Sequence, residues 1–192
     1  MALIKPYIQD KTFGKIDFTS EAPEGGEYDN CTFVNCDFSG VNLSGFHFSE
    51  CEFRSCNVSL AKLAKTALRD VKFYDCKLQG LHFYTCSELM FTVEFHNCIL
   101  DFSSFFKLPL KSTTFKNCSL READFSQANL TGSTFDNCDL SLATFDQTNL
   151  EKCDFRTAVN FTINPENNRL KKALFSVDGL TGLVQHLGIL VE

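Results

Sequence analysis

Large apolar residues recur at every fifth position over most of this sequence. From Cys31 the chain divides into blocks such as CTFVN, CDFSG, VNLSG, FHFSE and CEFRS, with Phe or Leu third in each of these blocks. The frame later resumes as VEFHN, CILDF, SSFFK and onward to CDFRT, and the 24 blocks have 13 Phe, 10 Leu and one Val at their centres. Helices and flat strands repeat their side-chain directions about every 3.6 and 2 residues, so neither explains a period of five. The pattern therefore indicates a repeat architecture.

The blocks resemble the pentapeptide-repeat pattern, in which a small residue, often with Asp or Asn after it, then Leu or Phe and two polar residues recur. The match covers about residues 28 to 157. The resemblance implies an all-β fold, a right-handed quadrilateral parallel β-helix in which four pentapeptides complete one coil. The central Leu or Phe would point inward, and the small residue two positions earlier would fill the corner.

Residues 20 apart should stack if four blocks make a coil, and the sequence supports this spacing. One column of block centres consists of Phe alone, and a neighbouring column of the small inward position consists of Cys alone. Both step by 20 residues except once, where a step of 22 indicates a two-residue insertion after Phe83. The columns are Phe33, Phe53, Phe73, Phe95, Phe115, Phe135 and Phe155, and Cys36, Cys56, Cys76, Cys98, Cys118 and Cys138. About six coils at the strand spacing of roughly 4.7–4.9 Å would make a rod about 30 Å long.

The insertion interrupts the repeats near residues 84–94, in the segment YTCSELMFTVE. The expected centre of this block is Glu88, which a core of Phe and Leu would not accept. The segment is therefore expected to bulge and to place Met90 or Phe91 inward instead. Candidate residues of a functional loop here are Tyr84, Glu88, Met90 and Phe91. The sequence leaves open whether the bulge is a tolerated irregularity or a contact site.

Both ends depart from the regular repeats. Residues 1–27 are expected to form an N-terminal cap with irregular first repeats, before a β-helix over residues 28–157. The period stops near residue 161, so residues 158–192 are expected to form a C-terminal cap or dimerisation segment. Ser176 suits a helix N-cap and Gly188 a helix stop. The short amphipathic helix between them either covers the last coil or pairs with a second copy, through the candidate residues Phe175, Leu180, Leu183, Val184, Leu187 and Ile189.

The ten cysteines look at first like a disulfide framework or a set of metal ligands. All of them, however, occupy the small inward position of the repeat, where they alternate with Ala, Val, Ser and Thr. Free Cys behaves as a small hydrophobe, and a stacked column lacks the tetrahedral convergence that structural zinc needs. We therefore expect the cysteines to be packing residues.

Composition and charge exclude several function classes. Apolar residues make up 44% and charged residues 22%, as in one globular domain, and neither a membrane span nor a secretory signal is recognisable, which predicts a cytoplasmic protein. Lys and Arg number 18 against 24 Asp and Glu, and the net charge of −6 argues against a general nucleic-acid binder. The four His lie in different repeats without partners for catalysis. We therefore expect no enzyme, cofactor or metal site.

The charges are banded along the chain. Residues 17–52 carry eight acids and no Lys or Arg, residues 54–77 carry six basic residues and two acids, and residues 107–121 carry four basic residues and no acid. Residues 122–154 then carry seven acids against Lys152 alone.

The tail INPENNRLKKALFS, with the segment that follows it, is similar to the tails of the pentapeptide-repeat proteins that protect type II topoisomerases, namely Qnr, MfpA, McbG and AlbG. This resemblance implies a homodimer, joined end to end, whose acidic surface mimics DNA. Such a dimer binds DNA gyrase or topoisomerase IV and protects it from inhibitors such as fluoroquinolones or peptide toxins. The implied contacts lie in the last acidic band and are Asp124, Asp136, Asp139, Asp146, Glu151 and Asp154.

Mimicry of DNA would be incomplete. Duplex DNA carries one negative charge per roughly 1.7 Å, or about 18 over 30 Å. This chain has a net charge of only −6, with basic bands between the acidic ones. The alternative function is a rigid β-solenoid scaffold for protein–protein interaction with no topoisomerase role. Binding that weakens with salt and competes with DNA would favour the mimic.

Overall fold

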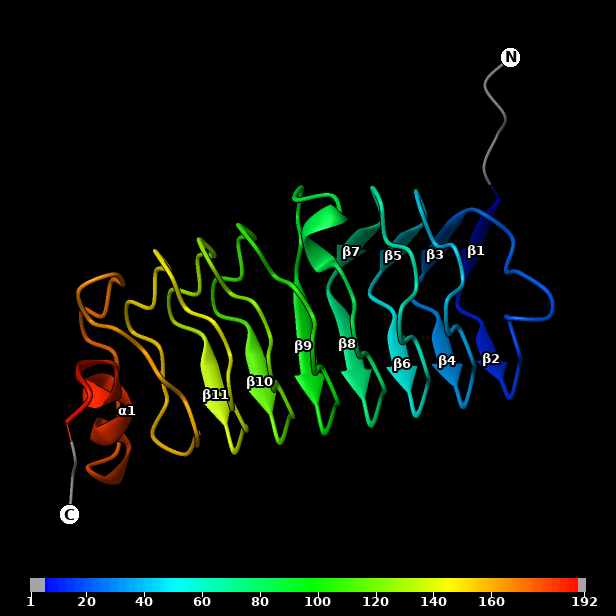
Figure 1. Cartoon of the computed structure of the whole chain (residues 1–192). Coiled ribbons are helices and arrows are strands. Elements are labelled where there is room, and N and C mark those ends of the chain that lie inside the picture. The colour runs from blue at the N-terminus through cyan, green and yellow to red at the C-terminus, as the bar shows by residue number, and fades with distance from the viewer. Residues whose placement is uncertain (1–5, 190–192) are drawn as a thin grey trace.

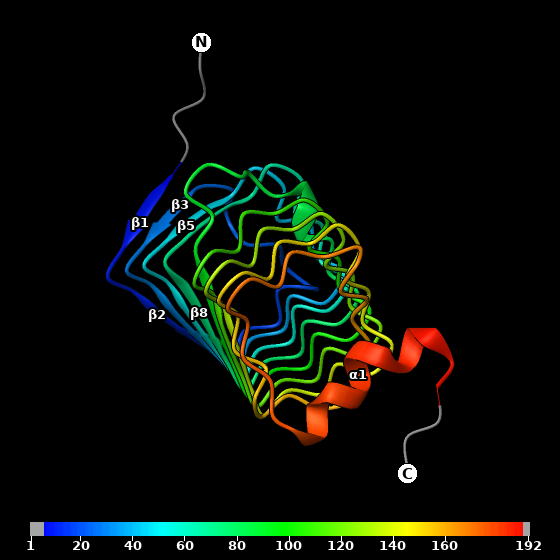
Figure 2. The same cartoon turned by 90° about the vertical axis from the view of Figure 1, so that its left-hand side faces the viewer.

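The computed structural model describes residues 6–189, which form a four-sided rod of stacked coils with a short helical segment at one end (Figures 1 and 2). The architecture is a right-handed parallel β-helix, as the resemblance to pentapeptide-repeat proteins implies. We name the four sides of the rod faces A to D, in the order in which each coil crosses them. No helix among these residues is both long and apolar enough to cross a membrane.

Two faces of the rod carry regular parallel sheets. Face A holds β1 (Tyr7–Gln9), β3 (Glu27–Asp29), β5 (His47–Ser49) and β7 (Ala67–Arg69), hydrogen-bonded in that order. Face B holds β2 (Thr12–Gly14), β4 (Thr32–Val34), β6 (Glu52–Arg54), β8 (Val71–Tyr74), β9 (Val93–His96), β10 (Thr114–Lys116) and β11 (Thr134–Asp136). On faces C and D, successive coils are joined by isolated parallel bridges, such as Ser119–Asp139 on face C and Ser104–Asp124 on face D.

A continuous column of stacked phenylalanine rings fills the core behind face B. Neighbouring ring centroids lie 4.7–5.4 Å apart, close to the spacing of the strands and within the range of offset aromatic stacking. The seven Phe predicted from the sequence all belong to this column, and Phe13 and Phe175 extend it at either end. A second column packs edge-on against it and consists of Phe83, Phe105, Phe125 and Phe145.

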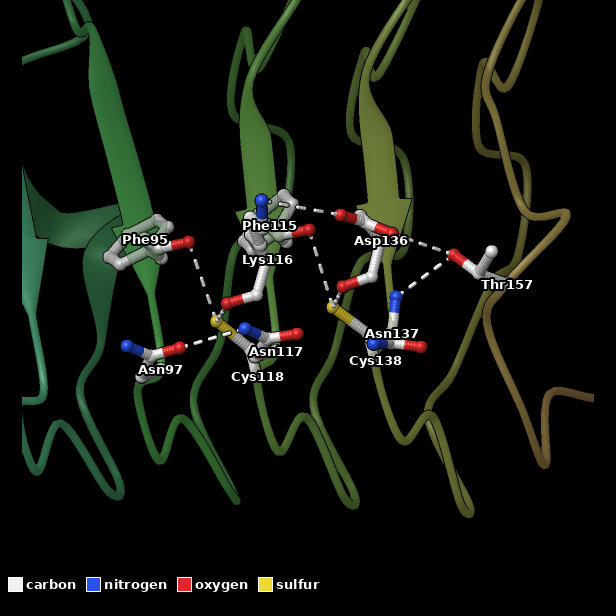
Figure 3. A network of polar contacts seen from close by, with 10 residues as sticks. All are labelled: Phe95, Asn97, Phe115, Lys116, Asn117, Cys118, Asp136, Asn137, Cys138 and Thr157. Carbon is white, nitrogen blue, oxygen red and sulfur yellow. Dashed lines mark hydrogen bonds and ion pairs between the residues drawn. The ribbon is translucent and has the colours of Figure 1, made fainter.

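The corners of the rod are turned by residues in the left-handed conformation. Apart from glycines, these residues have φ between 49° and 63°. Asn adopts this conformation more readily than most residues, and Asn97 and Asn117 occupy successive corners between faces B and C. The Asn117 amide nitrogen donates to the Asn97 side-chain oxygen at 2.9 Å (Figure 3). Corner side chains therefore point away from the core, where they are available for contacts.

The ten cysteines occupy the inward position that the repeat predicts, and all are buried as free thiols. The Cys118 sulfur lies 3.5 Å from the Phe95 carbonyl oxygen and 3.3 Å from that of Lys116, and Cys138 repeats the arrangement one coil on (Figure 3). Burial raises the pKa of the Cys86 thiol to about 12. Contact with the Cys138 thiol, together with burial, raises the pKa of Cys118 to about 12. The thiols are therefore neutral packing groups near neutral pH.

The coils continue beyond residue 161, where the sequence pattern places the end of the period. Parallel bridges reach Leu174, and the Phe175 ring stacks on Phe155 at 5.2 Å. The expectation is wrong because Asn160 and Pro165 occupy two positions where the repeat requires an apolar centre. The period of five is therefore interrupted in the sequence, although Leu170 and Phe175 follow in frame.

A short helical segment lies over the last coil (Figure 2). It consists of η2 (Asp178–Leu180), α1 (Thr181–Val184) and η3 (Gln185–Leu187). The Ser176 hydroxyl accepts from the Gly179 N–H at 3.0 Å, and Gly188, with φ of 67°, ends the segment, as the sequence predicts. Gly182 lies against Phe161 so closely that an added Cβ would come within 2.7 Å of the ring. The segment is thus packed directly on the end of the core.

Candidate functional site

The six acids that the sequence singles out lie on all four faces of the rod. Asp124 and Asp146 belong to face D, Asp136 and Asp154 to face B, Asp139 to face C and Glu151 to face A. The four faces point in different directions, so no single partner surface on one side of the rod can contact all six. Their closeness in the sequence reflects successive coils and not a common patch.

Three of these acids are paired with cations on neighbouring positions. Asp154 accepts from the Arg156 guanidinium at 2.7 Å, and these hydrogen bonds hold the pKa of Asp154 below its usual range. Burial alone would raise the pKa of Asp139, but hydrogen bonds from Ser141 and Asn160 outweigh it and the pKa is lowered. An Arg121 nitrogen also lies 3.7 Å from Asp139.

The third paired acid, Asp136, lies 3.9 Å from the Lys116 ammonium group and accepts from the Thr157 hydroxyl at 3.0 Å (Figure 3). Face B therefore presents ion pairs and not a run of free negative charge. Pairs of this kind at the surface contribute little to stability, because water and salt screen them.

Of the three acids without a cation partner, Asp124 and Asp146 lie on face D and Glu151 lies on face A. Asp124 accepts from the Ser104 hydroxyl at 3.2 Å and the Ser126 N–H at 2.9 Å, and Asp146 lies 3.5 Å from the Asn167 amide. None of these partners is a cation. Among the described residues, no Lys or Arg lies on face D in the coils from Glu122 to Glu166. Lys152 and Arg156, which belong to these coils, lie on other sides of the rod. We call the following set the acidic stretch: Glu122 at the corner between faces C and D, Asp124, Asp146 and Glu166.

The two-residue insertion forms a bulge that begins at η1 (Phe83–Thr85), the helical turn near the middle of the rod (Figure 1). Phe91 is buried, with its ring edge-on to Phe83 at 6.4 Å, so one of the two residues proposed for the interior does lie there. Met90 does not: its side chain is 58% exposed, because the residue turns the chain with φ of 58°. Tyr84 and Glu88 also face solvent, as expected for a bulge.

The candidate dimerisation residues divide into two groups. Phe175 and Leu183 pack against the core and so belong to the rod itself, and Val184 is half-buried. The remaining residues, Leu180, Leu187 and Ile189, are exposed, with 62% of Leu187 open to solvent. Sequence reasoning missed a fourth exposed residue of this group, Val177, because it precedes the helical pattern that was sought.

Comparison with known proteins identifies the repeat. A family model described as the pentapeptide repeat region matches residues 27–87 and 89–162, with its break at Glu88 in the bulge. No curated protein sequence matches the chain.

Solved structures show a likeness of fold. A trypsin-treated form of QnrB1, a plasmid-mediated fluoroquinolone resistance protein, aligns with 100% of this chain and 93% of its own, at a TM-score of 0.72 and 19% identity. A second trypsin-treated form aligns with 97% of this chain and 100% of its own, at a TM-score of 0.59 and 21% identity. Full-length QnrB1 aligns with 96% of this chain at a TM-score of 0.51 and 21% identity.

Proposed function

This chain belongs to the pentapeptide-repeat family, and from that premise we propose that it is a non-catalytic cytoplasmic protein that binds DNA gyrase or another type II topoisomerase in place of DNA. Bound in this way, it would protect the enzyme from inhibitors such as fluoroquinolones or peptide toxins. The similarity in fold over the whole chain to QnrB1, a plasmid-mediated fluoroquinolone resistance protein, supports the proposal. The observation that carries it is the acidic stretch.

The acidic stretch has the geometry that a DNA mimic requires. Asp124, Asp146 and Glu166 lie on three successive coils of face D, roughly 4.7–4.9 Å apart along the rod, and Glu122 lies at the corner of the first of these coils. One strand of duplex DNA presents a phosphate about every 3.4 Å along its axis, so the charges of the acidic stretch are more widely spaced than those of DNA and their density is lower. A basic groove built for DNA would attract this face, and the attraction would weaken as salt is added.

Dimerisation is part of the same proposal. The exposed residues Val177, Leu180, Leu187 and Ile189 lie in or beside the helical segment at the C-terminal end of the rod, which is the end nearer the acidic stretch. A hollow of about 730 Å³ beside them, lined in part by Leu142 and Val159, gives a second copy a place to pack. Pairing through this end would place an acidic stretch on each side of the joint and so double the length of the DNA-like surface.

One observation favours the alternative, a rigid scaffold without a topoisomerase role. The coils that carry Lys62, Lys65 and Arg69 interrupt the negative surface, and these cations have no acidic side-chain partner within residues 6–189. A scaffold binding an acidic protein would use them, whereas a DNA mimic would not.

Supercoiling by purified gyrase, measured with and without a fluoroquinolone while this protein is added, tests the proposal. We expect recovery of supercoiling in the presence of the drug, or direct inhibition in its absence. Asp146→Lys reverses a charge within the acidic stretch and should lose the effect. Glu151→Lys makes the same change on face A and is the matched control. No effect of the wild-type protein at concentrations well above that of gyrase would refute the proposal and favour the scaffold.

A further inference from the structure

An exposed aromatic patch interrupts the polar surface of the rod beside the bulge. Outward positions elsewhere are mostly polar or charged. Here Leu60 is 69% exposed, Phe102 56% and Tyr84 45%, and His82 is also open to solvent. We define the aromatic patch as Leu60 and Phe102, at the corner between faces C and D, with His82, Tyr84 and Phe106 on face D.

Backbone contacts between successive coils hold these side chains close together. His82 bridges to Ser104 on the next coil, and the Tyr84 N–H donates to the Ser104 carbonyl oxygen at 3.3 Å, which sets Tyr84 and Phe106 side by side. The His82 and Tyr84 rings are edge-to-face at 5.5 Å. The Lys107 ammonium group lies 4.8 Å from the Phe106 ring centroid, so the patch has a positively charged border.

Gly80 makes the corner continuous between Leu60 and Phe102. A Cβ on Gly80 would lie only 2.7 Å from a Leu60 methyl carbon, so Leu60 extends over the backbone of the intervening coil. The Gly80 N–H in turn donates to the Asp101 carbonyl oxygen, next to Phe102. The Leu60 side chain therefore covers the Gly80 corner, and Phe102 occupies the same corner on the next coil.

The fold itself does not require large apolar residues at this corner. Leu60 and Phe102 have φ of 58° and 61°, and glycine occupies the same corner at Gly40 and Gly80. Left-handed corners disfavour bulky side chains, and an exposed side chain gains no burial within its own chain. Contiguous exposed apolar surface marks interaction sites, and aromatic residues are enriched in the residues that dominate protein–protein binding.

The aromatic patch adjoins the acidic stretch on the same face. Ser104 bridges to His82 of the aromatic patch on the preceding coil and to Asp124 on the following coil. Asp124 is the first face D residue of the acidic stretch. A partner that binds the acids of face D therefore also contacts the aromatic patch. DNA has no equivalent of this apolar surface.

We infer that the topoisomerase partner contacts face D in two parts, with the acidic stretch in its basic DNA-binding groove and the aromatic patch in an apolar cleft of the enzyme beside that groove. The inference rests on the proposed function and deepens it. The apolar contact gives a protein of modest net charge a source of affinity that DNA lacks. It also makes that part of the affinity independent of salt, because apolar burial is not screened by ions.

Salt separates the two parts of the contact. The dissociation constant of the complex with intact gyrase is measured at low and high salt for the wild type, Phe102→Ser, Tyr84→Ser and Asp146→Lys. Phe102→Ser and Tyr84→Ser should each weaken binding about tenfold at both salt concentrations, with the salt dependence unchanged. Asp146→Lys should weaken binding mainly at low salt and reduce the salt dependence. Tyr7→Ser, which removes an exposed aromatic residue far from the aromatic patch, should bind as the wild type does.

Each other outcome overturns a defined part of the argument. Wild-type affinity in Phe102→Ser and Tyr84→Ser, with loss only in Asp146→Lys, would reject the aromatic contact and leave the proposed function intact. A changed salt dependence in Phe102→Ser would reject the separation into two parts. Absence of wild-type binding would reject the proposed function and the inference with it. Circular dichroism of each variant checks that it is folded, and we expect no unfolding because the substituted positions are exposed.

Discussion

Phe73 and Phe95 are partners in the parallel sheet of face B, and their rings stack at 5.4 Å although 22 residues separate them. The chain absorbs its two extra residues entirely in the bulge, and face B continues without a break. The ring column is therefore the element that keeps the coils aligned, whereas the surface of neighbouring faces is free to vary.

Loss of one ring from this column should be costly. Phe95→Ala should lower the free energy of unfolding by about 3–5 kcal/mol, because it removes a fully buried ring and leaves a cavity between two stacked neighbours. Phe102→Ala removes the same side chain from an exposed corner and should change stability by less than about 1 kcal/mol. Denaturant titration followed by circular dichroism measures both. Equal losses in the two variants would contradict the role of the column.

The columns could be predicted from the sequence because the period of five recurs in almost every block, so the register of each coil follows from simple counting. Which acids share a face could not be predicted from the acidic segment of the sequence, residues 122–154. Asp124 and Asp146 share face D although 22 residues separate them, whereas Asp136 and Asp139, only three apart, face different sides. The rod turns a corner every five residues, so nearness in the sequence says little about a common surface.

The helical segment shows a second limit of sequence reasoning. Ser176 and Gly188 mark its ends correctly because capping depends on local chemistry. Leu183 and Leu187, assigned to one helical face, differ in burial because the segment mixes 3-10 and α turns and because Gly182 draws one side onto Phe161. That tertiary contact leaves no periodic signal.

Gly182→Ala should detach the helical segment from the rod. The added Cβ would come within van der Waals overlap of the Phe161 carbonyl oxygen and ring, so the segment must move away, at a cost of about 1–3 kcal/mol. Denaturation and limited proteolysis of the C-terminal end measure the effect. Gly14→Ala is the control, because its Cβ would come no nearer than 4.0 Å to any such neighbour. Wild-type protease resistance in Gly182→Ala would show that the segment is not held by this contact.

Stability should fall at alkaline pH. Burial raises the pKa values of Cys51 and Tyr28 to about 12, above the ordinary values of 9.0 and 10.0. The folded chain thus holds these protons more tightly than the unfolded chain. The free energy of unfolding that the two protonated groups contribute is therefore fully present below about pH 8.5 and is lost as pH rises toward 12. Urea denaturation at a series of pH values should show this decline, and a thiol reagent at neutral pH should react only as the protein unfolds. Rapid reaction of the native thiols would contradict the buried, neutral state.

Leu187→Asp should convert the proposed dimer into a monomer, as measured by analytical ultracentrifugation. Leu187 is exposed at the end of the rod, so a carboxylate there costs nothing in the monomer but would be desolvated in an end-to-end contact. Leu183 is unsuitable for this test, because it packs against the core and its substitution would disturb the fold. Leu89→Asp introduces the same charge at an exposed residue of the bulge and should leave the dimer intact. A wild-type monomer at every concentration, or a dimer that persists in Leu187→Asp, would exclude association through this end of the rod.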